Sequence, residues 1–188
     1  MNSRSHNLNP MHMDQTLHNV TFHSDTILHR KNLLVGLGIE WRPNIRRDMN
    51  NPVATLQLCV GRRCLVFQIL HAPFIPHSLV SFLGNSNNTF VGVEIEGDVQ
   101  KLLEDCSFHV ANFLELPSLA VEKFADLELK GAGLKTLGLR VLGLEVDKPK
   151  KISWSRWDNL WLTAEQVEYA VVDAFVSSEI GLRLSSNN

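Results

Sequence analysis

The sequence lacks a long hydrophobic run and an excess of positive charge. Its longest apolar stretches, such as LVFQIL, fall far short of the ~18–20 residues that a membrane span needs, so we expect no membrane contact. The 18 Lys and Arg residues against 20 Asp and Glu give a net charge of −2, which argues against a protein that coats nucleic acid electrostatically. The N-terminus shows no apolar secretory signal, and we expect a cytoplasmic protein, with the nucleus as the alternative.

Cysteine is also scarce, and no CxxC spacing is present. Cys59, Cys64 and Cys106 are odd in number, which predicts reduced thiols and neither a disulfide framework nor a zinc site. Histidine is concentrated near the N-terminus, at positions 6, 12, 18, 23 and 29. This spacing places the rings on no common helical face, so solvated side chains are a better interpretation than metal ligands.

Length and composition indicate a single globular domain. The chain has 188 residues, of which 44% are hydrophobic and 20% charged. Residues 1–18, rich in Asn, His and Ser, are predicted to be a flexible tail. Residues 19–188 are predicted to form the domain, and the sequence contains no internal repeat.

The order of the predicted elements indicates an α/β fold. Apolar and alternating segments predict strands at 33–40, 55–60, 64–69, 89–95 and 112–116. Helical spacing predicts helices at 76–83, 98–105, 118–124 and 134–144, and a capping box at Thr163 begins a last helix that runs to about Leu184. Hairpins come first and crossovers follow, which predicts a mixed five-stranded sheet with helices packed on it.

Three carboxylates lie where their surroundings make a charge costly. Glu40 ends an apolar strand, Asp98 follows the fourth strand, and Asp173 lies in the apolar stretch YAVVDAF of the last helix. Tyr169 precedes Asp173 by four residues and shares its helix face. Converging carboxylates suit Mg²⁺ or Mn²⁺, and a pair of such ions would promote phosphodiester cleavage. The alternative is structural: a strand-end charge, a helix cap and a salt bridge.

The order of motifs along the chain carries a family resemblance. The matching segments are VGLGIEWRP (35–43), LQLCVGRRCLVFQI (56–69), VGVEIEGDVQKLLED (91–105), FLELPSLA (113–120), GLKTLGLRVLGLE (133–145) and KKISWSRWDNLWLTAEQVEYAVVDAF (150–175). Over about residues 33–182 the chain resembles the DEDDy branch of the DnaQ-like 3′–5′ exonucleases, which have a ribonuclease H-like fold. It is most similar to the exonuclease domain of the Werner syndrome protein and to the small plant RISC-interacting clearing exoribonucleases.

The resemblance implies a role for each matched residue. Glu40, Asp98 and Asp173 would be metal ligands, and Tyr169 would orient the attacking water. Leu37 and Trp41 would flank the 3′-terminal nucleotide. Arg42 is a further candidate for substrate binding through phosphate, with a solvated surface charge as the alternative. The cofactor implied is Mg²⁺ or Mn²⁺ in a two-metal site.

One position departs from the family pattern. The first motif of the family is Asp-x-Glu, whereas this chain has Gly38-Ile39-Glu40, so the carboxylate that bridges both metals is absent. Glu94, expected on the neighbouring fourth strand, is a candidate replacement; the alternatives are that Glu94 is a solvent-exposed charge or that a neighbouring subunit supplies the ligand.

The resemblance also implies partners. It implies a single-stranded RNA or DNA 3′ end as substrate, a homo-oligomeric ring such as a hexamer, and Argonaute in RISC as a protein partner. Several basic side chains are candidates for phosphate contacts or for a solvated surface: Arg46, Arg47, Arg62, Arg63, Lys148, Lys150, Lys151 and Arg156. The tryptophans at 154, 157 and 161 favour packing or a subunit contact over base stacking.

The prediction is therefore a metal-dependent 3′–5′ exonuclease that trims single-stranded nucleic acid, with a slight preference for RNA, and releases nucleoside monophosphates. The alternative is a pseudo-exonuclease that retains the fold and serves as a 3′-end binding or assembly subunit. Gly38 favours the alternative, whereas the retained Glu40, Asp98, Tyr169 and Asp173 favour the enzyme.

Overall fold

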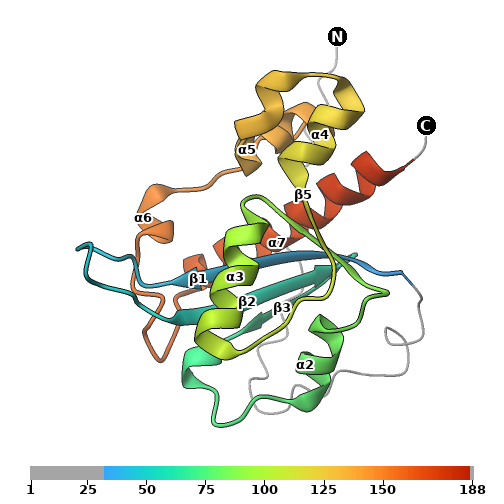
Figure 1. The fold of residues 1–188 in the computed structure, drawn as a ribbon. Coiled ribbons are helices and arrows are strands. Elements are labelled where there is room, and N and C mark those ends of the chain that lie inside the picture. The colour runs from blue at the N-terminus through green and yellow to red at the C-terminus, as the bar shows by residue number, and fades with distance from the viewer. Residues whose placement is uncertain (1–31, 187–188) are drawn as a thin grey trace. The chain divides into compact units, whose positions relative to one another are not determined.

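The computed structural model describes residues 32–186, which form a five-stranded sheet (Figure 1). The strands are β1 (Leu34–Trp41), β2 (Val53–Val60), β3 (Arg63–Phe67), β4 (Thr89–Gly92) and β5 (Phe113–Glu115). They lie in the order β3-β2-β1-β4-β5. Strands β1, β2 and β3 pair antiparallel, and β4 is parallel to β1 and to β5. The predicted mixed five-stranded α/β fold is confirmed.

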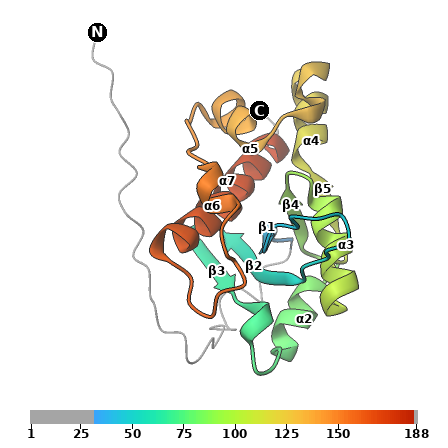
Figure 2. The ribbon, with the colours of Figure 1, turned by 90° about the vertical axis from the view of Figure 1, so that its left-hand side faces the viewer.

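Helices cover both faces of this sheet. They are α2 (His77–Leu83), α3 (Ile95–Cys106), α4 (Leu116–Phe124), α5 (Leu134–Leu137), α6 (Lys150–Ser153) and α7 (Ala164–Ser185). Two short 3-10 helices, η1 (Ile69–His71) and η2 (Leu127–Gly131), and one π-helix, η3 (Gly138–Leu142), complete the set in the described residues. Figure 2 shows α3 and α7 on opposite sides of the sheet. The capping box predicted at Thr163 is present, with its side chain accepting from the Gln166 backbone N–H.

Helix α7 lies unusually close to β1 because one strand position has no side chain. A Cβ atom added at Gly36 would lie 1.9 Å from the Ala174 carbonyl oxygen. Farther along α7, a Cβ added at Gly181 would lie 2.9 Å from side-chain atoms of Leu34 and Val91. The backbones therefore meet directly, and Asp173, the residue before Ala174, is held over the strand that carries Glu40.

The segment after β4 differs from the prediction. The fourth strand was expected to continue to residue 95, but β4 ends at Gly92 and α3 begins at Ile95. Glu94 stands between them as the N-cap, with φ 60° in the left-handed region. Asp98 consequently lies in the first turn of α3 and not at its cap.

The thiol prediction is wrong for two of the three cysteines. Cys59 and Cys64 are register partners across the β2–β3 hairpin, with their Cα atoms 4.1 Å apart, and they form a disulfide. The turn between them contains Gly61 at φ 55°, which brings the strands together tightly enough for the bond. Cys106 is a free, half-buried thiol.

Several predictions lie outside the described residues: the tail at 1–18, the start of the domain at 19 and the cluster of N-terminal histidines.

Within residues 32–186, no helix is long and apolar enough to cross a bilayer. Of the tryptophans at 154, 157 and 161, Trp157 is buried against Ala54 and Ala170, whereas Trp154 and Trp161 are exposed.

Candidate active site

Three elements bring the predicted residues together. Glu40 lies near the end of β1, Asp98 lies in the first turn of α3, and Tyr169 and Asp173 lie one turn apart on α7. The negative charge of Asp173 helps to raise the pKa of both Glu40 and Asp98, and the charge of Asp98 adds to the shift of Glu40. The three elements therefore bring these carboxylates near one another, and their joint role as one site remains a prediction.

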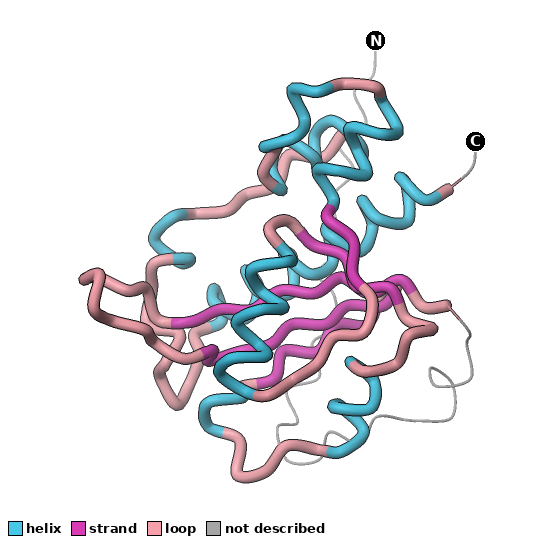
Figure 3. Tube along the Cα trace, in the orientation of Figure 1, coloured by secondary structure: helices cyan, strands magenta, loops and turns pink. Residues whose placement is uncertain are grey.

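Asp173 has a cationic partner from a distant loop. Lys148 lies in the segment 143–149, drawn as loop in Figure 3, and its ammonium forms an ion pair with the Asp173 carboxylate. The Lys148 Nζ also lies 5.2 Å from the centre of the Tyr169 ring. Burial lowers the pKa of Lys148, but the attraction and hydrogen bond of Asp173, together with the charges of Tyr169 and Glu40, more than offset it and the net shift is upward. This lysine therefore remains charged at neutral pH.

Glu40 is stabilised in its protonated form. Burial is the main cause that raises the pKa of Glu40 to about 8, and the negative charge of Asp173 adds to it. The charge of Lys148 acts in the opposite direction. Without a further cation, this carboxyl carries a proton through much of the neutral range.

Asp98 lies in a more acidic environment than the other two carboxylates. Its pKa is raised well above the usual value, chiefly by burial and then by the charges of Asp173, Glu94 and Glu115. Lys148 lowers the pKa of Asp98 as the smallest of the causes. The α3 side of the site is therefore rich in negative charge and poor in compensating positive charge.

Tyr169 is positioned as a neutral hydrogen-bonding group. Burial raises the pKa of its phenol, so the hydroxyl keeps its proton. The ring also packs at 6.0 Å, centre to centre, against the buried Trp157. This contact fixes the ring on the α7 side of the site.

A polar pair on β2 borders the position of the missing aspartate. Gly38 and Glu40 are register partners of Gln57 and Thr55, and both β2 side chains are buried. Gln57 Nε2 donates to Thr55 Oγ1 at 2.6 Å. A Cβ atom at Gly38 would lie 3.3 Å from Gln57 Oε1 and 3.7 Å from Asp173 Oδ2. The amide of Gln57 therefore reaches into the space beside Gly38.

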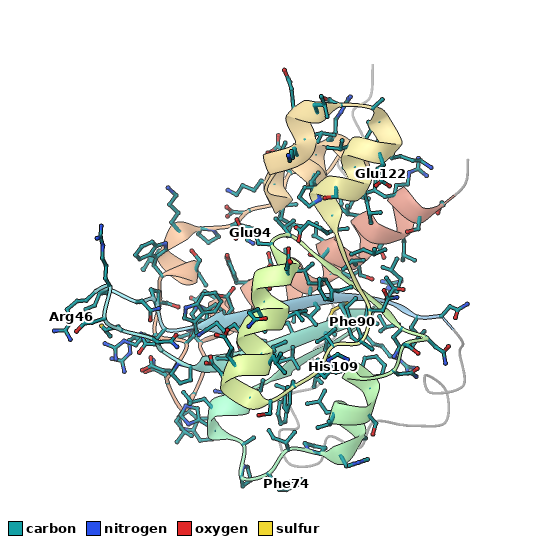
Figure 4. The ribbon with its side chains drawn as sticks, viewed as in Figure 1. Arg46, Phe74, Phe90, Glu94, His109 and Glu122 are labelled. Atoms are coloured by element: carbon teal, nitrogen blue, oxygen red, sulfur yellow. A yellow bond between two sulfur atoms is a disulfide. The ribbon has the colours of Figure 1, made fainter. Side chains whose placement is uncertain are left out.

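Glu94 does not occupy that space. The expectation that it lies on the fourth strand beside Gly38 is wrong, because β4 ends two residues earlier. Glu94 is exposed at the start of α3, as Figure 4 shows. Among the described residues, only Gln57 and Asp173 come within 4 Å of a Cβ at Gly38.

Glu115 is an acidic residue of this region that sequence reasoning missed. Its two carboxylate oxygens accept from the backbone N–H groups of Glu94 at 2.6 Å and Ile95 at 2.9 Å. A carboxylate is favourable at a helix N-terminus, so Glu115 fixes the start of α3 and thereby the position of Asp98.

The residues predicted to bind substrate are engaged within the protein. Leu37 is only 2% exposed and, by strand alternation, faces away from Glu40. Trp41 lies under Lys101, with Nζ 5.3 Å from the ring centre. Arg42 forms an ion pair with Asp158 at 3.5 Å. Their contact with a nucleotide remains a prediction.

The donor set suits a hard divalent cation, because the site is lined by carboxylate oxygens. In the described part of the chain, however, no group of three His, Cys, Asp or Glu side chains is assembled closely enough to hold an ion. The positive charge beside Asp173 in this arrangement is the ammonium of Lys148. That Glu40, Asp98 and Asp173 hold a metal ion remains a prediction.

Lys148 and Gln57 were not recognised from sequence as parts of this site. Lys148 is 25 positions from Asp173 and was considered as a phosphate contact, and no spacing rule joins a loop lysine to a helix carboxylate. For Gln57 a signal existed: Thr55 and Gln57 alternate with Leu56 and Leu58, so two polar residues share one face of an apolar strand.

The order of the five strands and the helices on both faces agree with the ribonuclease H-like fold that the sequence predicted. The sequence pattern of the 3′–5′ exonuclease family matches residues 17–187. The chain therefore belongs to the 3′–5′ exonuclease family.

Relatives agree with this assignment. The chain is 36% identical over 145 residues to a 3′–5′ exonuclease of Arabidopsis thaliana, which covers 76% of this chain and 49% of that protein. It is 36% identical over 154 residues to the bifunctional 3′–5′ exonuclease/ATP-dependent helicase WRN of Mus musculus, covering 81% of this chain and 11% of that protein. The chain thus spans about half the length of the Arabidopsis relative and a smaller part of the mouse protein.

Solved structures match the fold at lower identity. Escherichia coli RNase D superposes with a TM-score of 0.65 at 18% identity, covering 80% of this chain and 39% of that one. The Aedes aegypti Nibbler EXO domain gives 0.66 at 19% identity, covering 81% and 78%. These matches show a shared fold.

Proposed function

We propose that this chain trims single-stranded nucleic acid from the 3′ end, with Glu40, Asp98, Tyr169 and Asp173 as its working residues. The observation that supports the proposal best is the meeting of the three carboxylates from β1, α3 and α7 in a member of the 3′–5′ exonuclease family. Carboxylates in such costly surroundings need a function or a cation to compensate them.

In the proposed reaction, water attacks the phosphorus of the terminal phosphodiester. The bond from phosphorus to the 3′ oxygen of the preceding nucleotide breaks, that oxygen takes up a proton, and a nucleoside 5′-monophosphate leaves. Mg²⁺ or Mn²⁺ held by Glu40, Asp98 and Asp173 would supply charge stabilisation for the developing negative charge. The neutral hydroxyl of Tyr169 would hydrogen-bond the attacking water and orient it.

The test uses a 5′-labelled single strand of RNA and its DNA counterpart. We expect stepwise shortening in Mg²⁺ or Mn²⁺ and none in chelator. Asp173→Asn removes a charge with little change in volume and should lower the rate by about 10³-fold or more. Lys135→Gln is the matched control, because its ion pair with Asp147 is exposed and long at 3.9 Å. Equal shortening in chelator and in Mg²⁺ would contradict the proposal.

A second function is favoured by one observation, the glycine at position 38. A chain that binds the 3′ end without cutting it would retain the fold while lacking a carboxylate at this position. Fluorescence anisotropy on the same strands separates the two functions. Tight 3′-end binding with no shortening in any divalent cation identifies the binding protein.

The finer assignments remain part of this proposal. RNA is slightly preferred over DNA as substrate, the active form is a homo-oligomeric ring, and the protein partner is Argonaute in RISC, as the resemblance to the small plant exoribonucleases implies. Trp154 and Trp161, which are 70% and 75% exposed, provide apolar surface for a subunit contact. Light scattering at micromolar concentration checks the assembly, and a monomer mass alone would exclude the ring.

A further inference from the structure

The glycine at position 38 leaves a small space on the face of β1 that carries Glu40. Gly38 and Glu40 are two positions apart on one strand, so they face the same side of the sheet. We call the volume that a side chain at position 38 would occupy the Gly38 space. Apart from the neighbours of Gly38 in the chain, the described residues bring two atoms within 4 Å of a Cβ there, Gln57 Oε1 at 3.3 Å and Asp173 Oδ2 at 3.7 Å. Oxygen atoms from β2 and α7 therefore border this space.

Both bordering oxygens are hydrogen-bond acceptors. Gln57 is only 2% exposed, and its amide nitrogen donates to Thr55 Oγ1 at 2.6 Å, which turns Oε1 toward the Gly38 space. Lys148 pairs with Asp173 at Oδ1, so Oδ2 is the oxygen that faces the space. Within residues 32–186, no N–H or O–H group donates to Gln57 Oε1 or to Asp173 Oδ2. A buried acceptor needs a donor, so a group that enters this space must bring one.

This requirement selects among the groups of a nucleic acid strand. Phosphate oxygens are acceptors, and the Asp173 carboxylate would repel them. The N–H donors of a strand belong to its bases, whose rings are too large for a space the width of one small side chain. The sugar hydroxyls are small donors that lie next to the terminal phosphodiester. They are the groups of a strand that fit both the size and the chemistry of the Gly38 space.

We infer that the Gly38 space binds a hydroxyl group of the terminal sugar, and that Gln57 is a specificity-determining residue for this group. The hydroxyl would donate to Gln57 Oε1 or to Asp173 Oδ2. The inference rests on the proposed function, because it places the 3′-terminal nucleotide beside Glu40 and Asp173. Glycine at position 38 then provides the room that the sugar needs, and Gln57 provides an acceptor that adds no charge to an acidic site.

Strands that differ only in their last sugar test the inference. Four 5′-labelled strands of one sequence end in ribose, 2′-deoxyribose, 3′-deoxyribose or 2′,3′-dideoxyribose. Their dissociation constants are measured by fluorescence anisotropy in chelator, where no shortening is expected. The proteins are the unchanged chain, Gln57→Leu, Gly38→Ala and Gln100→Leu, each checked for fold by circular dichroism. Gln100→Leu is the matched control, because Gln100 is exposed on α3 and donates to Glu104.

The unchanged chain and the control should bind the ribose-ended strand about tenfold more tightly than the dideoxy-ended strand, as expected for one buried hydrogen bond. Gln57→Leu removes the amide at similar volume and should reduce this ratio to about threefold or less. Gly38→Ala fills the space with a methyl group and should reduce the ratio in the same way. The added methyl meets the end of the flexible Gln57 side chain, so we expect the fold to tolerate it. The 2′-deoxy and 3′-deoxy strands show which of the two hydroxyls is bound.

Three results would overturn the inference. They are equal affinity of the unchanged chain for all four strands, no binding of any strand, and a ratio that persists in both Gln57→Leu and Gly38→Ala. Equal affinity would mean that water, and not the sugar, supplies the donor. If Gln57→Leu does not fold, Gly38→Ala decides alone, because it leaves the amide in place.

The measurement also separates this inference from the proposed function, because it needs no cleavage. Discrimination between the sugars without shortening in Mg²⁺ would support the hydroxyl site and reject the nuclease assignment. Shortening in Mg²⁺ with equal affinity for all four strands would support the nuclease assignment and reject the hydroxyl site.

Discussion

The two acidic sides of the site are stabilised in different ways. On the α7 side, Asp173 is held against β1 by backbone packing at Gly36 and is neutralised by Lys148. On the α3 side, Asp98 lies near the carboxylates of Glu94 and Glu115. Among residues 32–186, Asp98 takes part in none of the ion pairs.

This difference shows how charge can be divided between the protein and its ligand. On the α7 side, charge is balanced within the folded chain, because the Asp173 carboxylate and the Lys148 ammonium belong to the same molecule. The α3 side carries unbalanced negative charge, which makes it the side where an external cation would stabilise the fold most. The experiments below are designed to weaken one side or the other.

The largest expected effect concerns the α7 side. Gly36→Ala would place a Cβ atom 1.9 Å from the Ala174 carbonyl oxygen, so the helix must move away from β1. We expect the free energy of unfolding to fall by about 3 kcal/mol or more, measured by urea denaturation. Gly97→Ala is the control, because in α3 nothing lies within 4 Å of the added atom.

The control should raise the free energy of unfolding by about 0.5–1 kcal/mol, since alanine favours a helix over glycine. Gly36→Ala should also separate Asp173 from Glu40 and weaken Mn²⁺ binding. If Gly36→Ala is as stable as the unchanged chain, close packing does not position Asp173.

Much of this arrangement was predictable from sequence, for identifiable reasons. Period-two and helical patterns located the five strands, and the capping box at Thr163 located the start of α7. The carboxylates at 40, 98 and 173 stood out because their neighbours are apolar. These are local signals, and local signals suffice where a residue's role depends on its own element.

Other features depended on contacts between distant segments. The ion pair of Lys148 with Asp173 requires the path of a loop, which no periodicity describes. The turn from β4 into α3 depends on Glu115 of β5, whose carboxylate accepts from the N–H groups of Glu94 and Ile95. The disulfide was missed because an odd cysteine count was given more weight than the hairpin that pairs Cys59 with Cys64.

A smaller effect is expected from pH in the absence of metal. Burial and neighbouring charge raise the pKa of Glu40 to about 8 and that of Asp98 upward as well. Both groups bind protons more tightly in the folded chain than in the unfolded chain. Their contribution to the free energy of unfolding is therefore complete below the pKa values of the unfolded chain and is lost as pH rises toward 8. We expect the free energy of unfolding in chelator to fall by on the order of a few kcal/mol between pH 5 and pH 9.

Glu40→Gln provides the comparison for this measurement. The amide does not titrate, so the decline with pH should become shallower in urea denaturation with chelator. Saturating Mn²⁺ should also reduce the decline in the unchanged chain, because a bound cation stabilises the ionised carboxylates. A profile that rises with pH in chelator would contradict the assignment of Glu40 as a buried, protonated carboxyl.

The smallest expected effect distinguishes two glutamates on the α3 side. Glu115→Gln removes the charge from the group that binds the N–H groups of Glu94 and Ile95 and leaves one carbonyl oxygen where there were two acceptors. We expect a loss of about 1 kcal/mol in the free energy of unfolding, as for other weakened helix caps. Glu94→Gln changes an exposed side chain and should stay within about 0.5 kcal/mol. Because a Cβ at Gly38 meets Gln57 and Asp173 and not Glu94, Glu94→Gln should also leave the Mn²⁺ stoichiometry unchanged. Loss of the bound ion in Glu94→Gln, with the fold intact, would instead make Glu94 a metal ligand. The α3 side would then supply two ligands, Glu94 and Asp98, although Glu94 is exposed in this structure.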